Sequence, residues 1–158
     1  MSFDGIEILL VDDSSADVEL TLRALRQDAL TKRIHIARDG EEALNFIYCR
    51  EPFRERVAEP LPQLILLDLK MPKVDGLSVL RTLKEDPRTR AIPVIIFTSS
   101  KEEKDVAKSY ELGVNSYIQK PVDFVQFRET IGTLGLYWLI FNQAPPRQPP
   151  KAITEKTG

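Results

Sequence analysis

Short apolar runs recur along the chain, and each run gives way to polar residues. Runs of this length bounded by turn residues predict strands, and the stretches between them repeat apolar residues every three or four positions, which predicts helices. The predicted strands are residues 6–11, 34–37, 64–67, 92–97 and 116–119. The first, third and fourth runs are almost continuously apolar, which is typical of strands buried on both faces.

Residues with capping side chains precede the predicted helices. Three pairs have the spacing of an N-cap with its third helical residue: Ser14 with Asp17, Asp39 with Glu42, and Ser100 with Glu103. The other helix boundaries are a start at Gly76, an end near Asp86, a stop at Gly113, and a last helix over residues 123–141. Five strands alternating with five helices predict an α/β fold, a doubly wound five-stranded parallel sheet with helices on both faces.

Composition is ordinary for a globular protein and excludes few functions by itself. The 158 residues hold 42% hydrophobic and 29% charged residues, with a net charge of −2. We expect one domain over residues 1–142 and a proline-rich tail over residues 143–158. The charge gives no drive toward nucleic acid or an anionic membrane, and no apolar run is long enough for a membrane span. Residues 1–5 hold no basic residue, so the start is not expected to be a secretory signal. The expected location is therefore cytoplasmic.

Three carboxylates end the most apolar strands. Asp12 and Asp13 follow the first run, and Asp68 follows the third. Ligands of such folds bind outside the carboxyl ends of the strands, so these acids should share one crevice. Like charges raise each other's pKa, and a divalent cation with oxygen ligands, Mg²⁺, is the simplest counter-charge.

Two further strand ends complete the predicted site. Thr98 ends the fourth strand with a hydroxyl, and Lys120 follows the fifth strand with a cation. Acids, a hydroxyl and a lysine are the parts of a phosphoryl-transfer site, in which one carboxylate is the nucleophile. The single histidine, His35, and the single cysteine, Cys49, lie outside this set and are expected to be structural, so the sequence indicates no zinc site and no internal disulfide.

The motifs resemble those of the receiver domains of two-component response regulators. The segments that carry the resemblance are 11–13, 67–72, 75–76, 97–99 and 117–121, and the match spans about residues 5–141. The resemblance implies a flavodoxin-like (βα)5 fold and a signalling protein, not an enzyme in its own right. Asp68 would accept a phosphoryl group from a histidine kinase.

The resemblance also implies a role for each neighbouring residue. Asp13 and Asp68 would bind Mg²⁺ directly, Asp12 would bind it through water, and the backbone carbonyl of Lys70 would be a further ligand. Thr98 would hydrogen-bond the phosphoryl group and Lys120 would pair with it. Tyr117 would be an aromatic switch, and the peptide bond from Lys120 to Pro121 would be cis.

Three alternatives remain open at this stage. The first is a degenerate receiver that acts as a phosphorylation-independent interaction module. The second is an aspartyl-phosphate phosphatase of the haloacid-dehalogenase type, which would need a second acid where Lys70 stands. The third is a flavin or nucleotide carrier, which the acidic turn after the first strand disfavours because it lacks a glycine-rich phosphate loop.

Two segments exceed a minimal receiver. Residues 48–63 form a long loop of alternating charge, which is either a solvated insertion or a kinase-docking surface. The last helix is apolar nearly all round beyond Leu134, which predicts a homodimer through that helix and the tail. The alternative is that the proline-rich tail folds back over this apolar patch. Both segments are similar to those of single-domain regulators that partner bacterial and cyanobacterial phytochromes. We therefore expect output by partner binding or phosphorelay, with a bacteriophytochrome as a candidate kinase.

Overall fold

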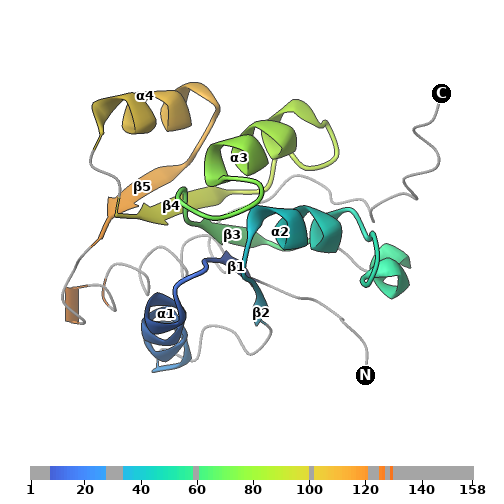
Figure 1. Cartoon of the computed structure of the whole chain (residues 1–158), viewed down its shortest axis with the longest axis horizontal. Coiled ribbons are helices and arrows are strands. Elements are labelled where there is room, and N and C mark those ends of the chain that lie inside the picture. The colour runs from blue at the N-terminus through green and yellow to red at the C-terminus, as the bar shows by residue number, and fades with distance from the viewer. Residues whose placement is uncertain are drawn as a thin grey trace.

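The computed structural model describes residues 8–27, 34–58, 61–99, 102–120, 125–126 and 129. Within this part the chain forms one five-stranded sheet, and all of its strand pairs are parallel (Figure 1). The strands are β1 (Ile8–Val11), β2 (Ile34–Ala37), β3 (Leu64–Leu67), β4 (Val94–Thr98) and β5 (Ser116–Gln119). Their order is β2-β1-β3-β4-β5, so the doubly wound parallel sheet predicted from the sequence is confirmed.

The described helices lie on both faces of this sheet. They are α1 (Ser15–Gln27), α2 (Gly40–Ile47), α3 (Gly76–Glu85) and α4 (Glu103–Glu111), with a short 3₁₀ helix η1 (Arg54–Ala58). Figure 1 shows α2, α3 and α4 on one side of the sheet and α1 on the other. The predicted helix over residues 123–141 and the tail lie outside the described residues, apart from residues 125–126 and 129.

Alternation along the strands creates two buried layers. Leu9 and Val11 of β1 face α2 and α3, whereas Ile8 and Leu10 face α1. Both sets are at most 1% exposed, as the near-continuous apolar run predicted. In the register of β1 and β3, Val11 pairs with Leu67, so the two strands end level with each other. The residues that follow these strands therefore emerge at the same edge of the sheet.

Helix starts agree with the sequence at the first two predicted caps. The Ser14 hydroxyl accepts a hydrogen bond from the Asp17 N–H at 3.2 Å, and the Asp39 carboxylate accepts one from the Glu42 N–H at 2.8 Å. Gly113 has a φ of +104° just after α4, a conformation that suits glycine.

Two predicted boundaries were wrong. The fourth strand begins at Val94, not at residue 92, because Pro93 has no N–H to donate to the ladder. The N-cap of α4 is Glu102, which makes no side-chain capping bond, so the predicted cap of Ser100 with Glu103 does not start this helix. Ser100 itself lies outside the described residues.

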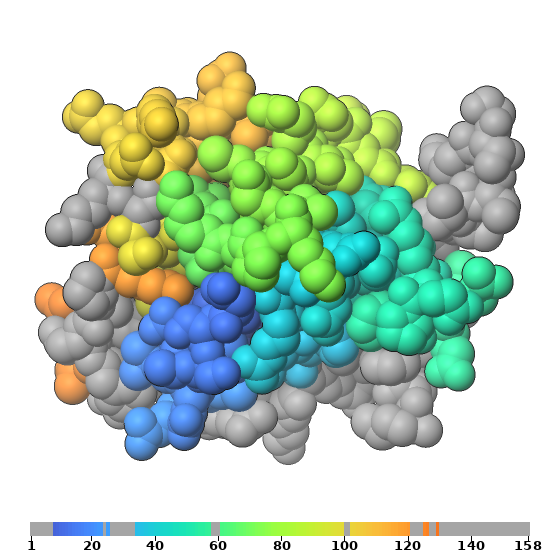
Figure 2. All heavy atoms as spheres, in the orientation of Figure 1, coloured from blue at the N-terminus to red at the C-terminus, as the bar shows by residue number. Residues whose placement is uncertain are grey.

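The loop of alternating charge over residues 48–63 is not merely a solvated insertion, because part of it is buried. Arg56 in η1 is fully buried, and its guanidinium lies 3.7 Å from the centre of the Phe46 ring and donates to the Phe46 carbonyl. This contact holds η1 against α2, and Figure 2 shows the atoms of the two segments side by side. Cys49 is buried next to Arg56, which agrees with its predicted structural role.

No helix within the described residues is long and apolar enough to cross a membrane.

Candidate functional site

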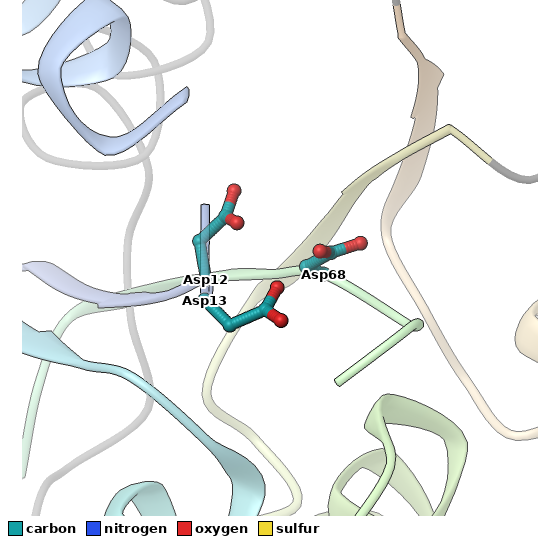
Figure 3. A group of neighbouring side chains, drawn as sticks. All are labelled: Asp12, Asp13 and Asp68. Carbon is teal, nitrogen blue, oxygen red and sulfur yellow. The ribbon is translucent and has the colours of Figure 1, made fainter. Parts of the chain in front are cut away.

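Asp12, Asp13 and Asp68 gather at the carboxyl ends of β1 and β3, as the sequence predicted. Each offers a carboxylate oxygen within 4.8 Å of the others, and the close-up shows them around a common space (Figure 3). Asp12 is 1% exposed and Asp68 is 6% exposed, whereas Asp13 is open to solvent. The cluster is therefore a partly buried acidic site with one face accessible to a ligand.

Backbone hydrogen bonds position the two buried acids. The Asp12 N–H donates to the Ala37 carbonyl at 3.0 Å, and the Asp68 N–H donates to the Val11 carbonyl at 2.9 Å. These bonds continue the strand ladders past their last residues. The Asp12 carboxylate also accepts from the Ser14 N–H at 2.9 Å. Both acids are consequently held by the sheet itself.

Close packing fixes the chain just after Asp68. A Cβ atom added to Gly76 would lie 2.3 Å from the Asp68 carbonyl oxygen and 2.6 Å from the Leu69 Cα. A Cβ on Gly40 would lie 1.9 Å from the Val74 carbonyl oxygen. Each contact is with backbone, which has little freedom to move away. The two glycines therefore allow α2 and α3 to press the β3–α3 loop against the end of the sheet.

Lys120 supplies the positive charge of the site. Its ammonium nitrogen lies 3.0 Å from an Asp12 carboxylate oxygen, 2.7 Å from Asp17 and 3.7 Å from Asp68. Burial alone would lower the pKa of Lys120, but the three carboxylates, Asp17 first, raise it above its ordinary value. Burial raises the pKa of Asp12, against the opposing effects of the Ser14 N–H and of Lys120.

Thr98 and Tyr117 also lie where the sequence predicted. Thr98 is the last residue of β4 and is fully buried, and its carbonyl accepts from the Lys120 N–H at 2.7 Å. Tyr117 in β5 is half-buried and packs against the core layer beneath α2 and α3. The peptide bond between Lys120 and Pro121 lies outside the described residues.

Lys70 directs its side chain toward the start of α4 and not into the cluster of Asp12, Asp13 and Asp68. Its ammonium lies 3.5 Å from Asp105 and 3.7 Å from Glu102, so it connects the loop after β3 to the start of α4. Its N–H lies 3.4 Å from an Asp68 carboxylate oxygen. An open hollow beside the site is lined in part by Asp13, Lys70, Met71 and Asp105. The hollow therefore borders the acidic cluster at its solvent-exposed member, Asp13.

Asp17 is the site residue that the sequence interpretation missed. We assigned it only as a capping partner in α1, yet its carboxylate makes the shortest of the three contacts of Lys120 with acids. Asp17 stands in the first turn of the helix that follows a strand end with site residues, and a carboxylate at that place can be predicted to lie near the site. Its pairing with Lys120, 103 residues away in the chain, is a tertiary contact that local spacing does not reveal.

The oxygen donors fit a hard divalent cation. Three carboxylates with one solvent-facing member suit Mg²⁺ or Mn²⁺, which prefer oxygen ligands and retain water. His35 lies apart from this cluster, stacked on Phe46 with 4.0 Å between ring centres. This packing agrees with the structural role predicted for His35.

Comparison with known proteins identifies the class. The family model of the response regulator receiver domain matches residues 8–132, and the chain belongs to this family. It is therefore a response regulator of two-component signalling with the receiver fold, and the resemblance stated from the motifs is confirmed.

Particular relatives refine this picture. The probable methanogenesis regulatory protein FilR2 of Methanothrix harundinacea is 39% identical over 142 residues, covering 90% of this chain and 89% of FilR2. The response regulator Rcp1 of Synechocystis is 38% identical over 132 residues, covering 84% and 88%.

Solved structures show the same similarity. The Mn²⁺-bound form of Rcp1 superimposes with a TM-score of 0.78 at 37% identity, covering 88% of this chain and 98% of Rcp1. The bacteriophytochrome response regulator RtBRR gives a TM-score of 0.73 at 48% identity, covering 90% of this chain and 85% of RtBRR.

Proposed function

We propose that Asp68 is the phosphoacceptor of this response regulator and that a histidine kinase is the donor. The observation that carries the proposal is the acidic cluster at the ends of β1 and β3, paired with the Lys120 ammonium 3.7 Å from Asp68. A carboxylate oxygen of Asp68 would form a bond to phosphorus while the bond from phosphorus to the donor's imidazole nitrogen breaks. The electron pair leaves with the imidazole, which takes up a proton.

Mg²⁺ is the proposed cofactor. Asp13 and Asp68 would bind it directly, Asp12 through water, and Lys70 through its backbone carbonyl. The ion would neutralise charge that develops on the transferring phosphoryl oxygens. The Mn²⁺-bound structure of the similar protein Rcp1 supports this ligand chemistry.

Lys120 and Thr98 would handle the transferred group. Lys120 would pair with a phosphoryl oxygen, and the Thr98 hydroxyl would donate a hydrogen bond to another. Tyr117 would then move into the space that Thr98 leaves, which would alter the face formed by α4 and β5. Output would follow from changed partner binding or from onward phosphorelay, so the protein is a signalling protein rather than a separate catalyst.

The test is acyl-phosphate formation with a small-molecule phosphodonor and Mg²⁺. Intact-mass spectrometry should show one added, hydroxylamine-labile phosphoryl group on wild type and none on Asp68→Asn. Asp75→Asn is the matched control, because Asp75 is an exposed acid in the same loop that caps α3 and asparagine also caps helices. Label retained on Asp68→Asn would move the phosphoacceptor elsewhere, and label formed in excess chelator would exclude the metal requirement.

Two rival functions have less support. A haloacid-dehalogenase phosphatase needs a second acid two residues after the nucleophile, where this chain has Lys70 directed at α4. A degenerate receiver would lack one or more site residues. Here the three acids are present, Lys120 lies 3.7 Å from Asp68, and the Thr98 carbonyl accepts from the Lys120 N–H.

We further propose that the kinase is a bacteriophytochrome and that the protein acts in the cytoplasm. The 48% identity to the bacteriophytochrome response regulator RtBRR supports this partner. A phosphotransfer profile against all histidine kinases of the source organism would test it. Preferential transfer from a kinase without a phytochrome photosensor would refute the assignment.

A homodimer through residues 123–141 and the tail is the last part of the proposal, with the receiver over residues 1–142 and the tail over residues 143–158. Its support is the apolar sequence near Leu139, where covering each aliphatic side chain contributes about 1.5–3 kcal/mol. Light scattering at tens of micromolar protein should show a dimer that Leu139→Asp disrupts. A monomeric wild type, or an unchanged variant, would contradict the proposal. The net charge of −2 supports no nucleic-acid or membrane partner.

A further inference from the structure

The Lys120 ammonium forms ion pairs both with acids of the cluster and with an acid outside it. The nitrogen lies 3.0 Å from Asp12 and 3.7 Å from Asp68, both members of the cluster, but only 2.7 Å from Asp17 in α1. Asp17 is not one of the three acids that form the cluster. Its side chain is 32% exposed, against 1% for Asp12. The closest acidic partner of the lysine is therefore an acid that the proposed metal chemistry does not use.

The backbone holds Asp17 in place. Its N–H donates to the Ser14 hydroxyl at 3.2 Å, and its carbonyl accepts from the Thr21 hydroxyl at 2.8 Å. Thr21 is fully buried, so this first turn of α1 is anchored at both ends. A carboxylate in the first helical turn is also stabilised by the positive end of the helix dipole. Asp17 is thus a fixed negative charge on the α1 side of the ammonium.

We propose that Asp17 is a positioning residue that draws Lys120 toward α1 and so keeps Asp12 and Asp68 available to the divalent cation. Lys120 and Mg²⁺ compete for these carboxylates, because each supplies the counter-charge that the buried acids need. Without the charge of Asp17, the ammonium transfers its interaction to Asp12 and Asp68. The cation must then displace a more tightly held lysine, and its affinity falls.

This inference rests on the proposed Mg²⁺ binding, and it is tested by metal affinity rather than by phosphorylation. Isothermal titration calorimetry of the full-length, unphosphorylated protein with MgCl₂ gives Kd directly. We expect Asp17→Asn to weaken binding by between about three-fold and ten-fold, the range of moderate coupling between contacting charges. Asp17→Glu, which retains the charge, should restore at least part of the affinity.

Two controls separate the lysine-mediated effect from the loss of one charge. Glu19→Gln removes the same charge from an exposed position in the same helix and should leave Kd unchanged. In a Lys120→Met background, adding Asp17→Asn should no longer weaken Mg²⁺ binding, because no ammonium remains to be repositioned. If Lys120→Met does not fold, Lys120→Gln serves the same purpose, with urea unfolding as the check on every variant.

Three results would overturn the inference. The first is Asp17→Asn with the Kd of wild type. The second is an equal weakening by Asp17→Asn and Glu19→Gln, which would reduce Asp17 to one charge among others. The third is an equal change in the Kd for Mg²⁺ on Asp17→Asn with and without Lys120. That result would show that the charge of Asp17 acts directly on the cation and not through Lys120. A wild type that binds no Mg²⁺ would instead refute the proposed metal site, and this inference with it.

Discussion

His35 should make the protein lose stability as the pH falls below neutrality. The ring stacks on Phe46 and meets Phe53 edge-on with 5.3 Å between ring centres. Burial first, and then the positive charge of Arg56, lower the pKa of His35 from 6.5 to about 4. Glu42 is the acid near Nε2, but 3.9 Å is too long for a hydrogen bond that would stabilise the protonated ring. The folded protein therefore keeps His35 neutral.

The direction and size of this loss of stability follow from the difference in proton binding between the unfolded and folded states. In the unfolded chain the ring has its ordinary pKa of about 6.5, so between pH 6.5 and pH 4 the unfolded state binds more protons than the folded state. The contribution of His35 is thus present above pH 6.5 and is lost as the pH falls toward 4. For these pKa values the loss between pH 7 and pH 5 is at most about 2 kcal/mol. Since the side chain is 22% exposed, solvent screening reduces the expected loss to between about 1 and 2 kcal/mol.

Urea unfolding at pH 7 and pH 5 measures this effect. The comparison is with His35→Phe, which keeps an aromatic ring on Phe46 but has no proton to gain. Other titrating groups contribute equally to both proteins and cancel in the difference. Wild type should lose about 1–2 kcal/mol more than the variant between the two pH values. Equal losses would refute the assignment of His35 as a partly buried histidine that stays neutral in the folded protein.

Three other perturbations have defined outcomes. Gly40→Ala should reduce the free energy of unfolding by about 1–3 kcal/mol in urea, because its Cβ would lie 1.9 Å from the Val74 carbonyl oxygen; an unchanged midpoint would contradict this contact. Lys120→Met, measured in excess chelator, should lower the free energy of unfolding by about 3–5 kcal/mol, because it leaves buried carboxylates without their cation. Added Mg²⁺ should restore part of this loss, and a variant insensitive to Mg²⁺ would argue against the metal site. Thr98→Ala should accept phosphate at Asp68 yet fail to change amide exchange over residues 98–120, and a response equal to that of wild type would exclude the proposed switch.

The fold and most of the site could be predicted because they depend on local pattern and on topology. Apolar runs located the strands, and the rule that parallel strands present their carboxyl ends at one edge brought Asp12, Asp13 and Asp68 together. Thr98 and Lys120 followed from the same rule. None of these predictions needed knowledge of side-chain packing.

The residues that escaped prediction are governed by tertiary contacts. Arg56 belongs to a charged run typical of a solvated loop, yet its guanidinium packs on Phe46 and is fully buried. Asp17 has the spacing of an ordinary capping residue, and its second role appears only when β5 brings Lys120 next to α1. A strand boundary at Pro93 was misplaced because apolar character continues where the backbone donor is missing.

The ion pair between Lys120 and Asp12 joins residues 108 positions apart in the chain. A contact this distant in sequence carries a large loop-closure cost, because the intervening segment must be ordered for the two residues to meet. During synthesis the acids leave the ribosome long before the lysine does, so a nascent chain carries the negative charges of the site without their counter-charge. The positive charge of the site therefore reaches its carboxylates only when β5 has docked beside β4.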